Sequence, residues 1–185
     1  MGEFELIARH FARPVRRAVL GVGDDCALLA PTPGMQLAVS SDMLVEGRHF
    51  VSTVAPERLG HKALAVNLSD LAACGAQPLA FTLSIAMPRP DETFLTGFAR
   101  GLHALAEAHA IELVGGDTTA GPLVVGITVI GELPPGQALR RDGARAGDRL
   151  WVSGRLGDAR LALEALRVTG PAKSDGQPCE KLAEV

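Results

Sequence analysis

The segment from residue 91 to residue 133 places the strongest constraint on the fold. In residues 91–110 the apolar side chains recur at helical spacing on one face, which predicts an amphipathic helix. Two apolar runs follow, residues 111–114 and residues 123–133, and both predict strands. The longer run contains two glycines and Glu132, and it is too short to cross a bilayer. Strands that alternate with helices predict an α/β or α+β domain.

The rest of the chain follows the same alternation. We expect further helices at residues 4–11, 56–73 and 156–168, and further strands at residues 26–30, 36–41, 79–86 and 149–153. The strand at 36–41 is expected to stop at Asp42, and the strand at 111–114 to stop at Gly115.

Composition excludes several classes of protein. The 185 residues carry a net charge of −3, only 4% of them are aromatic and none is Tyr, so we expect no nucleic-acid partner. The three cysteines form no C-x-x-C pair, and the N-terminus carries acids where a signal peptide needs basic residues. We therefore expect a reduced, cytoplasmic protein without a membrane segment, with Cys26 and Cys74 as small core residues.

Acidic residues stand at unusual places in this sequence. Asp24 and Asp25 close the string Gly-Val-Gly-Asp-Asp, Asp117 closes Gly-Gly-Asp, and Asp42 follows a strand. Asp70 interrupts a helix that is otherwise apolar on nearly every side. A carboxylate in such surroundings is costly to desolvate unless it is paired or binds a cation.

These acids together predict a site for a metal ion and phosphate. Asn67 and Asp70 are three residues apart on one helical face, so both side chains can point at one site. Mg²⁺ prefers oxygen ligands and usually shares them with phosphates, while neighbouring glycines let phosphate oxygens approach the backbone.

Each acid also has a simpler interpretation. The two glycine-containing strings could be solvated turns, Asp42 could cap a helix, and Asp70 could pair with Lys62 two helical turns away. The motifs of P-loop, Rossmann, zinc-protease, serine-hydrolase and protein-kinase sites are not found in the sequence. We favour the metal and phosphate site because independent turns would not all need acids.

Seven strings in order along residues 2–168 point to one family. They are Gly2-Glu-Phe-Glu-Leu-Ile7, Gly21-Val-Gly-Asp-Asp-Cys-Ala27, Ser41-Asp-Met-Leu-Val-Glu-Gly-Arg-His-Phe50, Lys62-Ala-Leu-Ala-Val-Asn-Leu-Ser-Asp-Leu-Ala-Ala73, Gly75-Ala-Gln-Pro78, Gly115-Gly-Asp-Thr-Thr119 and Gly154-Arg-Leu-Gly-Asp158. With these strings the chain resembles the thiamine-monophosphate kinase family of the aminoimidazole ribonucleotide synthetase-like superfamily.

The resemblance implies a fold and a reaction. The fold would be a mixed sheet flanked by helices, and the sheet would pair with that of a second subunit into a barrel, giving a homodimer. The reaction would be Mg²⁺-dependent transfer of the γ-phosphoryl group of ATP to thiamine monophosphate, which yields thiamine diphosphate. This agrees with the residues, because phosphoryl transfer needs positioning and charge neutralisation more than a covalent nucleophile.

Position by position, the resemblance also implies roles for individual residues. Those that would hold or support Mg²⁺ are Asp25, Ser40, Ser41, Asp42, Asp70 and Asp117. Those that would contact ATP are Gly116, Asp117 and Arg141. His49 would lie on the thiamine-phosphate side. Arg141 is a candidate phosphate clamp, with Arg140 and Arg145 as neighbouring alternatives, and no general base is assigned because the acceptor oxygen is already deprotonated near neutral pH.

The resemblance also divides the chain. We expect residues 1–135 to form an N-terminal domain that binds ATP and Mg²⁺ and dimerises. Residues 136–168 would form a linker and the first strand and helix of a truncated second domain, and residues 169–185 a disordered or non-native tail.

Two alternatives to the kinase remain open. One is a sister ATP-dependent synthetase of the purine-biosynthesis type on the same scaffold. The other is a non-catalytic, dimerising nucleotide-binding module, which is the description we favour for the isolated 185-residue polypeptide.

Overall fold

The structure is a computed structural model that describes residues 2–152 and 154–169. The chain divides into two compact units after Gly143. The first unit is built on a four-stranded sheet in the order β3–β6–β4–β5, formed by β3 (Gln36–Val45), β4 (Gln77–Met87), β5 (Glu112–Ala120) and β6 (Val124–Leu133). β6 runs antiparallel to β3 and β4, whereas β4 and β5 are parallel. The mixed α/β architecture is therefore confirmed.

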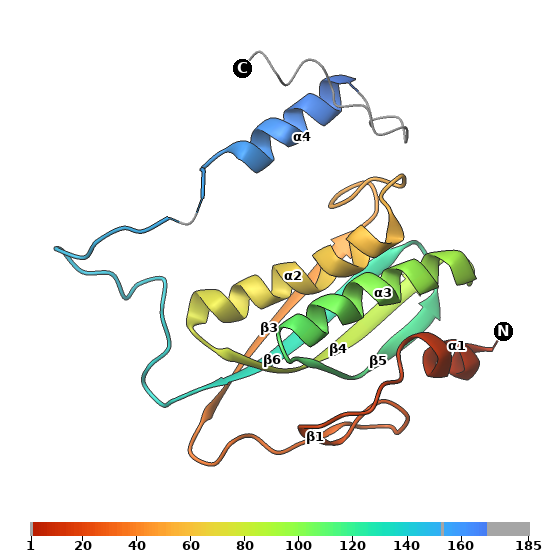
Figure 1. Cartoon of the computed structure of the whole chain (residues 1–185), viewed down its shortest axis with the longest axis horizontal. Helices are drawn as coiled ribbons and strands as arrows, with labels where there is room; N and C mark the ends of the chain where they lie inside the picture. The colour runs from red at the N-terminus through yellow and green to blue at the C-terminus, as the bar shows by residue number, and fades with distance from the viewer. Residues whose placement is uncertain (1, 153, 170–185) are drawn as a thin grey trace. The chain divides into compact units, whose positions relative to one another are not determined.

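Three helices accompany this sheet. α1 (Glu3–His10) opens the chain, and α2 (Pro56–Cys74) and α3 (Glu92–Ala108) lie side by side over one face of the sheet (Figure 1). α2 has Pro56 in its first turn and ends at Gly75, whose φ of +74° is left-handed. α3 begins at Asp91, whose carboxylate accepts a hydrogen bond from the Phe94 N–H at 3.0 Å. The expected helices therefore form close to their expected bounds.

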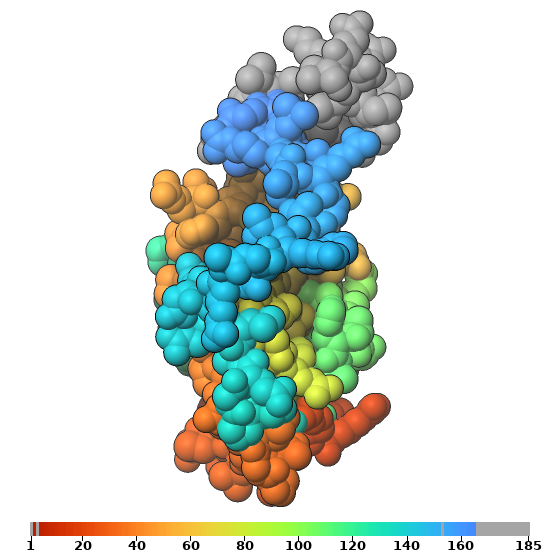
Figure 2. Space-filling view, turned by 90° about the vertical axis from the view of Figure 1, so that its left-hand side faces the viewer, coloured from red at the N-terminus to blue at the C-terminus, as the bar shows by residue number. Residues whose placement is uncertain are grey.

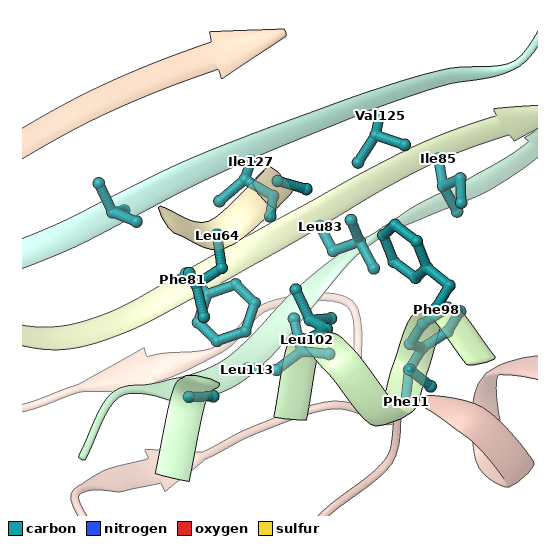
Figure 3. Packing of buried hydrophobic residues seen from close by; sticks show 14 of the residues in the cluster. Phe11, Leu64, Phe81, Leu83, Ile85, Phe98, Leu102, Leu113, Val125 and Ile127 are labelled. Atoms are coloured by element: carbon teal, nitrogen blue, oxygen red, sulfur yellow. The ribbon is translucent and has the colours of Figure 1, made fainter. Parts of the chain in front are cut away.

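The main core lies between the sheet and these helices. Alternate side chains of β4 and β6 point toward α2 and α3, among them Phe81, Leu83 and Ile127, and they meet Phe98 and Leu102 of α3 (Figure 3). All five are at least 96% buried. This period of two in the strands and the apolar stripe of α3 explain why the sheet carries its helices on this face.

The opposite face of the sheet carries a small hairpin and an exposed apolar row. The hairpin strands β1 (Ala18–Leu20) and β2 (Leu28–Leu29) pair with each other and belong with a small cluster around Leu79 and Val114. On β3, the side chains of Leu37, Val39 and Met43 are 49%, 64% and 61% exposed.

Two strands run further than the sequence predicted. β3 continues through Asp42 to Val45, since Asp42 pairs with Ile127 of β6, and β5 continues through Asp117, which pairs with Ser84 of β4. Asp42 and Asp117 are therefore strand residues, and the turn interpretation of Gly-Gly-Asp is wrong. The backbone groups of these two residues form hydrogen bonds with the neighbouring strand, and such pairing cannot be predicted from local sequence.

The prediction that Cys26 and Cys74 are small core residues is also wrong. Cys26 lies in the loop before β2 and Cys74 is the last residue of α2, and both are exposed rather than packed in the core. Residues 134–143, which follow β6 and are cyan in Figure 2, reach this end of α2, where the Leu139 N–H donates to the carbonyl of Cys74 at 3.0 Å.

In the second unit, the described residues contain one helix, α4 (Asp158–Thr169). The expected strand at 149–153 does not form over residues 149–152, where no strand partner lies within the described chain. The expected tail falls almost wholly on residues 170–185, which are outside the described residues. Over the described ranges, no helix has both the length and the apolar character that crossing a membrane requires.

Candidate functional site

A pocket of about 520 Å³ opens between α1, the loop that carries Asp24 and Asp25, and β5. Its polar wall holds the carboxylates of Asp24, Asp25 and Asp117 beside the Gly115–Gly116 backbone. Its apolar wall is formed by Phe4, Ile7, Phe11, Leu83 and Leu113. The volume is that of a small-molecule site, and the two walls suit a ligand with an apolar part and an anionic part neutralised by a cation.

The pocket depends on the backbone at Gly116. This residue has φ +146°, and a Cβ built on it would stand 1.8 Å from the carbonyl oxygen of Leu83. No other residue type fits this close approach of β5 to β4. Gly116 also lines the pocket, together with Gly115.

A second polar cluster joins α2 to β3. The Ser40 Oγ donates to Asp70 Oδ2 at 2.5 Å, and the Asp42 N–H donates to Asn67 Oδ1 at 3.0 Å. The buried Asn67 also donates from Nδ2 to the carbonyl of Ala63 at 2.9 Å. Asn67 and Asp70 therefore point toward the same strand, as the spacing predicted.

Ser41 and Asp42 follow Ser40 on β3 and point to opposite faces of the sheet. The Ser41 hydroxyl is 2.9 Å from the Thr128 Oγ1 and 3.2 Å from the carbonyl oxygen of Ile127. Because successive side chains of a strand alternate, Ser40 and Ser41 point to opposite faces of the sheet. Asp42 is exposed. It follows Ser40 on the side of the sheet that carries α2.

The pocket and the second cluster lie at opposite edges of the sheet. β3 and β5 are separated by β6 and β4, hence by three inter-strand spacings or roughly 14 Å. Among the described residues, no three His, Cys, Asp or Glu side chains are grouped closely enough to hold a metal ion. The structure thus brings Asp25, Gly116 and Asp117 together and Ser40, Asp42 and Asp70 together, but it does not join the two groups within one chain.

His49 and Arg141 lie outside the pocket. His49 is in the turn after β3, where its Nδ1 accepts a hydrogen bond from the Val45 N–H at 3.0 Å. Arg141 is exposed, and within the described chain its side chain makes no hydrogen bond or ion pair. Arg140, a neighbouring alternative, binds both oxygens of Asp142 at 2.9 Å. Of these two neighbours, only Arg141 leaves its guanidinium unengaged.

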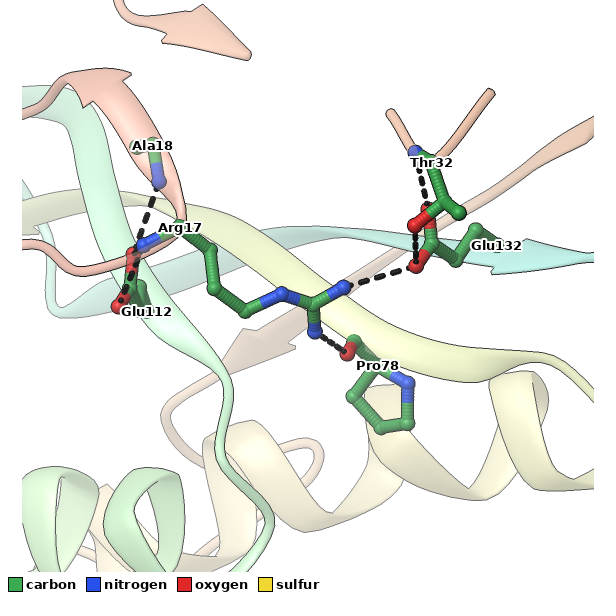
Figure 4. A network of polar contacts seen from close by, with 6 residues as sticks. All are labelled: Arg17, Ala18, Thr32, Pro78, Glu112 and Glu132. Carbon is green, nitrogen blue, oxygen red and sulfur yellow. Dashed lines mark hydrogen bonds and ion pairs between the residues drawn. The ribbon is translucent and has the colours of Figure 1, made fainter. Parts of the chain in front are cut away.

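A polar network, of which Glu132 is the buried member, anchors the loop that carries Asp24 and Asp25 (Figure 4). It was not predicted from the sequence. In the segment before the loop, the backbone N–H groups of residues 16, 17 and 18 donate hydrogen bonds to the carboxylate of Glu112. In the segment after the loop, the N–H and the hydroxyl of Thr32 donate hydrogen bonds to the carboxylate of Glu132, both at 2.9 Å. Arg17 connects the two anchors by donating to Glu132 at 2.8 Å and to the carbonyl of Pro78 at 2.9 Å.

Both anchoring carboxylates are held ionised. The Thr32 N–H and hydroxyl, helped by the Arg17 guanidinium, hold the pKa of Glu132 below its ordinary value. Burial raises the pKa of Glu112, but the three backbone N–H groups outweigh it and lower this pKa on balance. The sequence does contain a signal for this network, because Glu132 is the one acid in the apolar run 123–133.

Comparisons with known proteins identify the family of the chain. Residues 23–133 match the family described as AIR synthase related protein, N-terminal domain. Thiamine-monophosphate kinase from Salmonella typhimurium is 48% identical over 170 residues, which cover 90% of this chain and 52% of the relative. The chain thus spans about half the length of the curated relatives that it matches.

Solved structures give the same result. The crystal structure of thiamine-monophosphate kinase from Stenotrophomonas maltophilia K279a has a TM-score of 0.78 and 47% identity, and the match covers 89% of this chain and 52% of that one. AaThiL complexed with AMPPCP and TMP has a TM-score of 0.72 and 33% identity, with 83% of this chain and 48% of that chain covered. The chain therefore belongs to the family of AIR synthase related proteins, whose N-terminal domain it contains.

Proposed function

We propose that this chain provides the nucleotide- and metal-binding part of a thiamine-monophosphate kinase. The reaction is transfer of the γ-phosphoryl group of ATP to the phosphate of thiamine monophosphate. The observation that carries the proposal is the pocket that sets Asp25 and Asp117 beside the Gly116 backbone and opposite an apolar wall. The named kinases at 47–48% identity, and the relative complexed with AMPPCP and TMP, support this substrate pair.

The residues of the pocket fit Mg²⁺. This ion prefers oxygen ligands, retains several waters and usually takes only one or two protein carboxylates together with substrate phosphates. Asp24, Asp25 and Asp117 offer carboxylate oxygens at one pocket. Asp42 and Asp70, supported by Ser40, offer a second set at the other edge of the sheet. When bound, Mg²⁺ would offset the repulsion between the donor and acceptor phosphates.

The chain's own residues would then act by positioning. The apolar wall around Phe11 and Leu113 takes up the apolar part of the nucleotide and limits the access of water. Gly116 lets a phosphate come close to the backbone, and Arg141 is free to bind a phosphate oxygen. His49 contacts thiamine monophosphate. No general base is needed, because the acceptor is an ionised phosphate oxygen.

We also propose that two copies of the chain associate through β3, on the sheet face opposite α2 and α3, and that the protein works in the cytoplasm. The exposed apolar side chains of Leu37, Val39 and Met43 support the association, because apolar side chains gathered on one surface mark interaction sites. Light scattering after gel filtration should give a dimer for the chain and for Val51→Glu, which changes an equally exposed loop valine, and a monomer for Val39→Glu. A Val39→Glu variant that stays dimeric contradicts this interface.

The test of the function is a comparison of acceptors. With Mg²⁺ and AMPPCP present, calorimetric titration should show binding of thiamine monophosphate, and Asp117→Asn should abolish it. Binding of a purine-pathway intermediate in place of thiamine monophosphate would assign the chain to the sister synthetase. A parallel assay for thiamine diphosphate formation from ATP addresses the non-catalytic alternative, since turnover by the 185-residue chain would rule that alternative out.

A further inference from the structure

We propose that Lys62 is a positioning residue, which holds the turn at residues 45–50 so that His49 presents its Nε2–H outward as a hydrogen-bond donor. The inference deepens the proposed function and rests on it in one respect, namely that His49 faces the phosphate-bearing acceptor. The role of Lys62 itself rests on the contacts between α2 and this turn. The sequence alone suggests for Lys62 only a possible pairing with Asp70.

The turn is closed by reciprocal hydrogen bonds between Val45 and His49. The His49 N–H donates to the carbonyl of Val45 at 2.9 Å, and the Val45 N–H donates to the His49 ring at 3.0 Å. The Gly47 N–H adds a bond to the carbonyl of Phe50 at 2.8 Å. The turn is therefore built so that the imidazole of His49 closes it and Phe50 enters the core.

The bond from Val45 determines the tautomer of His49. A ring nitrogen that accepts an N–H carries no proton, so Nδ1 is the bare nitrogen and the proton of the neutral ring is on Nε2. The side chain is exposed, and Nε2–H is the one ring donor left for a ligand. A phosphate oxygen, which only accepts hydrogen bonds, matches such a donor.

Lys62 holds this turn from outside. Its Nζ donates to the carbonyl of His49 at 2.5 Å and thereby connects the turn to α2. The same helix contacts β3 through Asn67 and Asp70, one and two turns further on. α2 therefore fixes both the acidic cluster of β3 and the histidine turn that follows this strand. Hydrogen bonds of charged groups are about twice as strong as neutral ones, which suits Lys62 to this task.

The experiment compares the full chain with Lys62→Met, Lys62→Arg and Arg58→Met, the last removing an exposed cation one turn earlier on α2. Side-chain ¹⁵N spectra of the His49 ring should show a bare Nδ1 and a protonated Nε2 in the chain, in Lys62→Arg and in Arg58→Met. In Lys62→Met the ring should interconvert between tautomers, and the amides of Val45 and His49 should exchange about tenfold faster, as expected for the loss of one hydrogen bond.

A Lys62→Met variant with the original ring spectrum and the original exchange rates would overturn the proposal. Titration with thiamine monophosphate in the presence of Mg²⁺ and AMPPCP then separates the two claims. Weakened binding in both Lys62→Met and His49→Ala supports both claims. If thiamine monophosphate binds His49→Ala as tightly as the original chain, the acceptor-side role of His49 is refuted. The role of Lys62 in positioning the turn is then decided by the ¹⁵N spectra and the exchange rates.

Discussion

The carboxylate of Asp70 is bound by the hydroxyl of Ser40, 2.5 Å away on the neighbouring strand, and not by Lys62 on its own helix. The bond lies between α2 and β3, where Asp70 is half-buried. A hydroxyl donor satisfies one carboxylate oxygen without neutralising the charge. An acid in an apolar helix that is hydrogen-bonded but not neutralised remains available to a cation.

The charge of Asp70 is predicted to be needed for magnesium-dependent nucleotide binding. A ligand at one hundred times its dissociation constant stabilises a protein by about 2.7 kcal/mol, so ATP with Mg²⁺ should raise the melting temperature of the chain. Asp70→Asn keeps the shape and removes the charge, and it should lose most of this rise. Thermal shift with and without EDTA measures the effect. Glu107→Gln, an exposed change on α3, should behave like the original chain, and an undiminished rise in Asp70→Asn contradicts the prediction.

Gly116 is predicted to tolerate no side chain. A Cβ would stand 1.8 Å from the Leu83 carbonyl oxygen, and φ is +146°, so Gly116→Ala should cost at least about 2 kcal/mol of unfolding free energy. Gly115 offers a matched control, because a Cβ built on it would lie 4.0 Å from its nearest neighbour, the Thr82 methyl group. Gly115→Ala should therefore stay within about 0.5 kcal/mol. Urea unfolding gives both values, and equal costs for the two variants would refute the close approach.

The ion pair of Arg17 and Glu132 is predicted to stabilise the fold more than an exposed pair does. Glu132 is only 4% exposed, so Arg17→Met leaves a buried carboxylate with fewer partners and should cost roughly 1–3 kcal/mol. The exposed pair of Arg140 and Asp142 is the control, and Arg140→Met should change the free energy of unfolding by less than about 0.5 kcal/mol. Equal effects of the two arginine changes in urea unfolding would contradict the prediction.

The same network predicts a stability loss in acid. The pKa values of Glu112 and Glu132 are lower in the folded chain than the ordinary value of 4.5. Their contribution is therefore fully present above this value and is lost as the pH falls through the lowered folded values, because the unfolded chain then binds more protons. Melting temperatures measured from pH 7 downward should decline below about pH 4.5, and less steeply in Glu132→Gln than in the original chain. If the melting temperatures of Glu132→Gln and of the original chain decline equally with falling pH, Glu132 is not responsible for the loss of stability.

Much of the fold followed from local pattern. The apolar stripe of residues 91–110, the glycine after residue 74 and the run at 123–133 gave the helices and strands that form the first unit. The same reasoning failed where pairing decided the outcome. Asp42 and Asp117 have the composition of turns, yet they continue strands because β6 and β4 offer partners. Residues 149–152 have the composition of a strand and form none, because no partner strand lies beside them in the described chain.

The sequence by itself determined which chemical groups this protein has: acids beside glycines, an acid in an apolar helix, and the family to which they belong. Only the tertiary structure decided how these groups are distributed. Asp25 and Asp117 share a pocket at β5, whereas Asp42 and Asp70 lie at β3, on the far side of β6 and β4. The physical reason is that spacing along a chain fixes neighbours on one helix or strand, while distances across a sheet depend on strand order, which is set by pairing and burial.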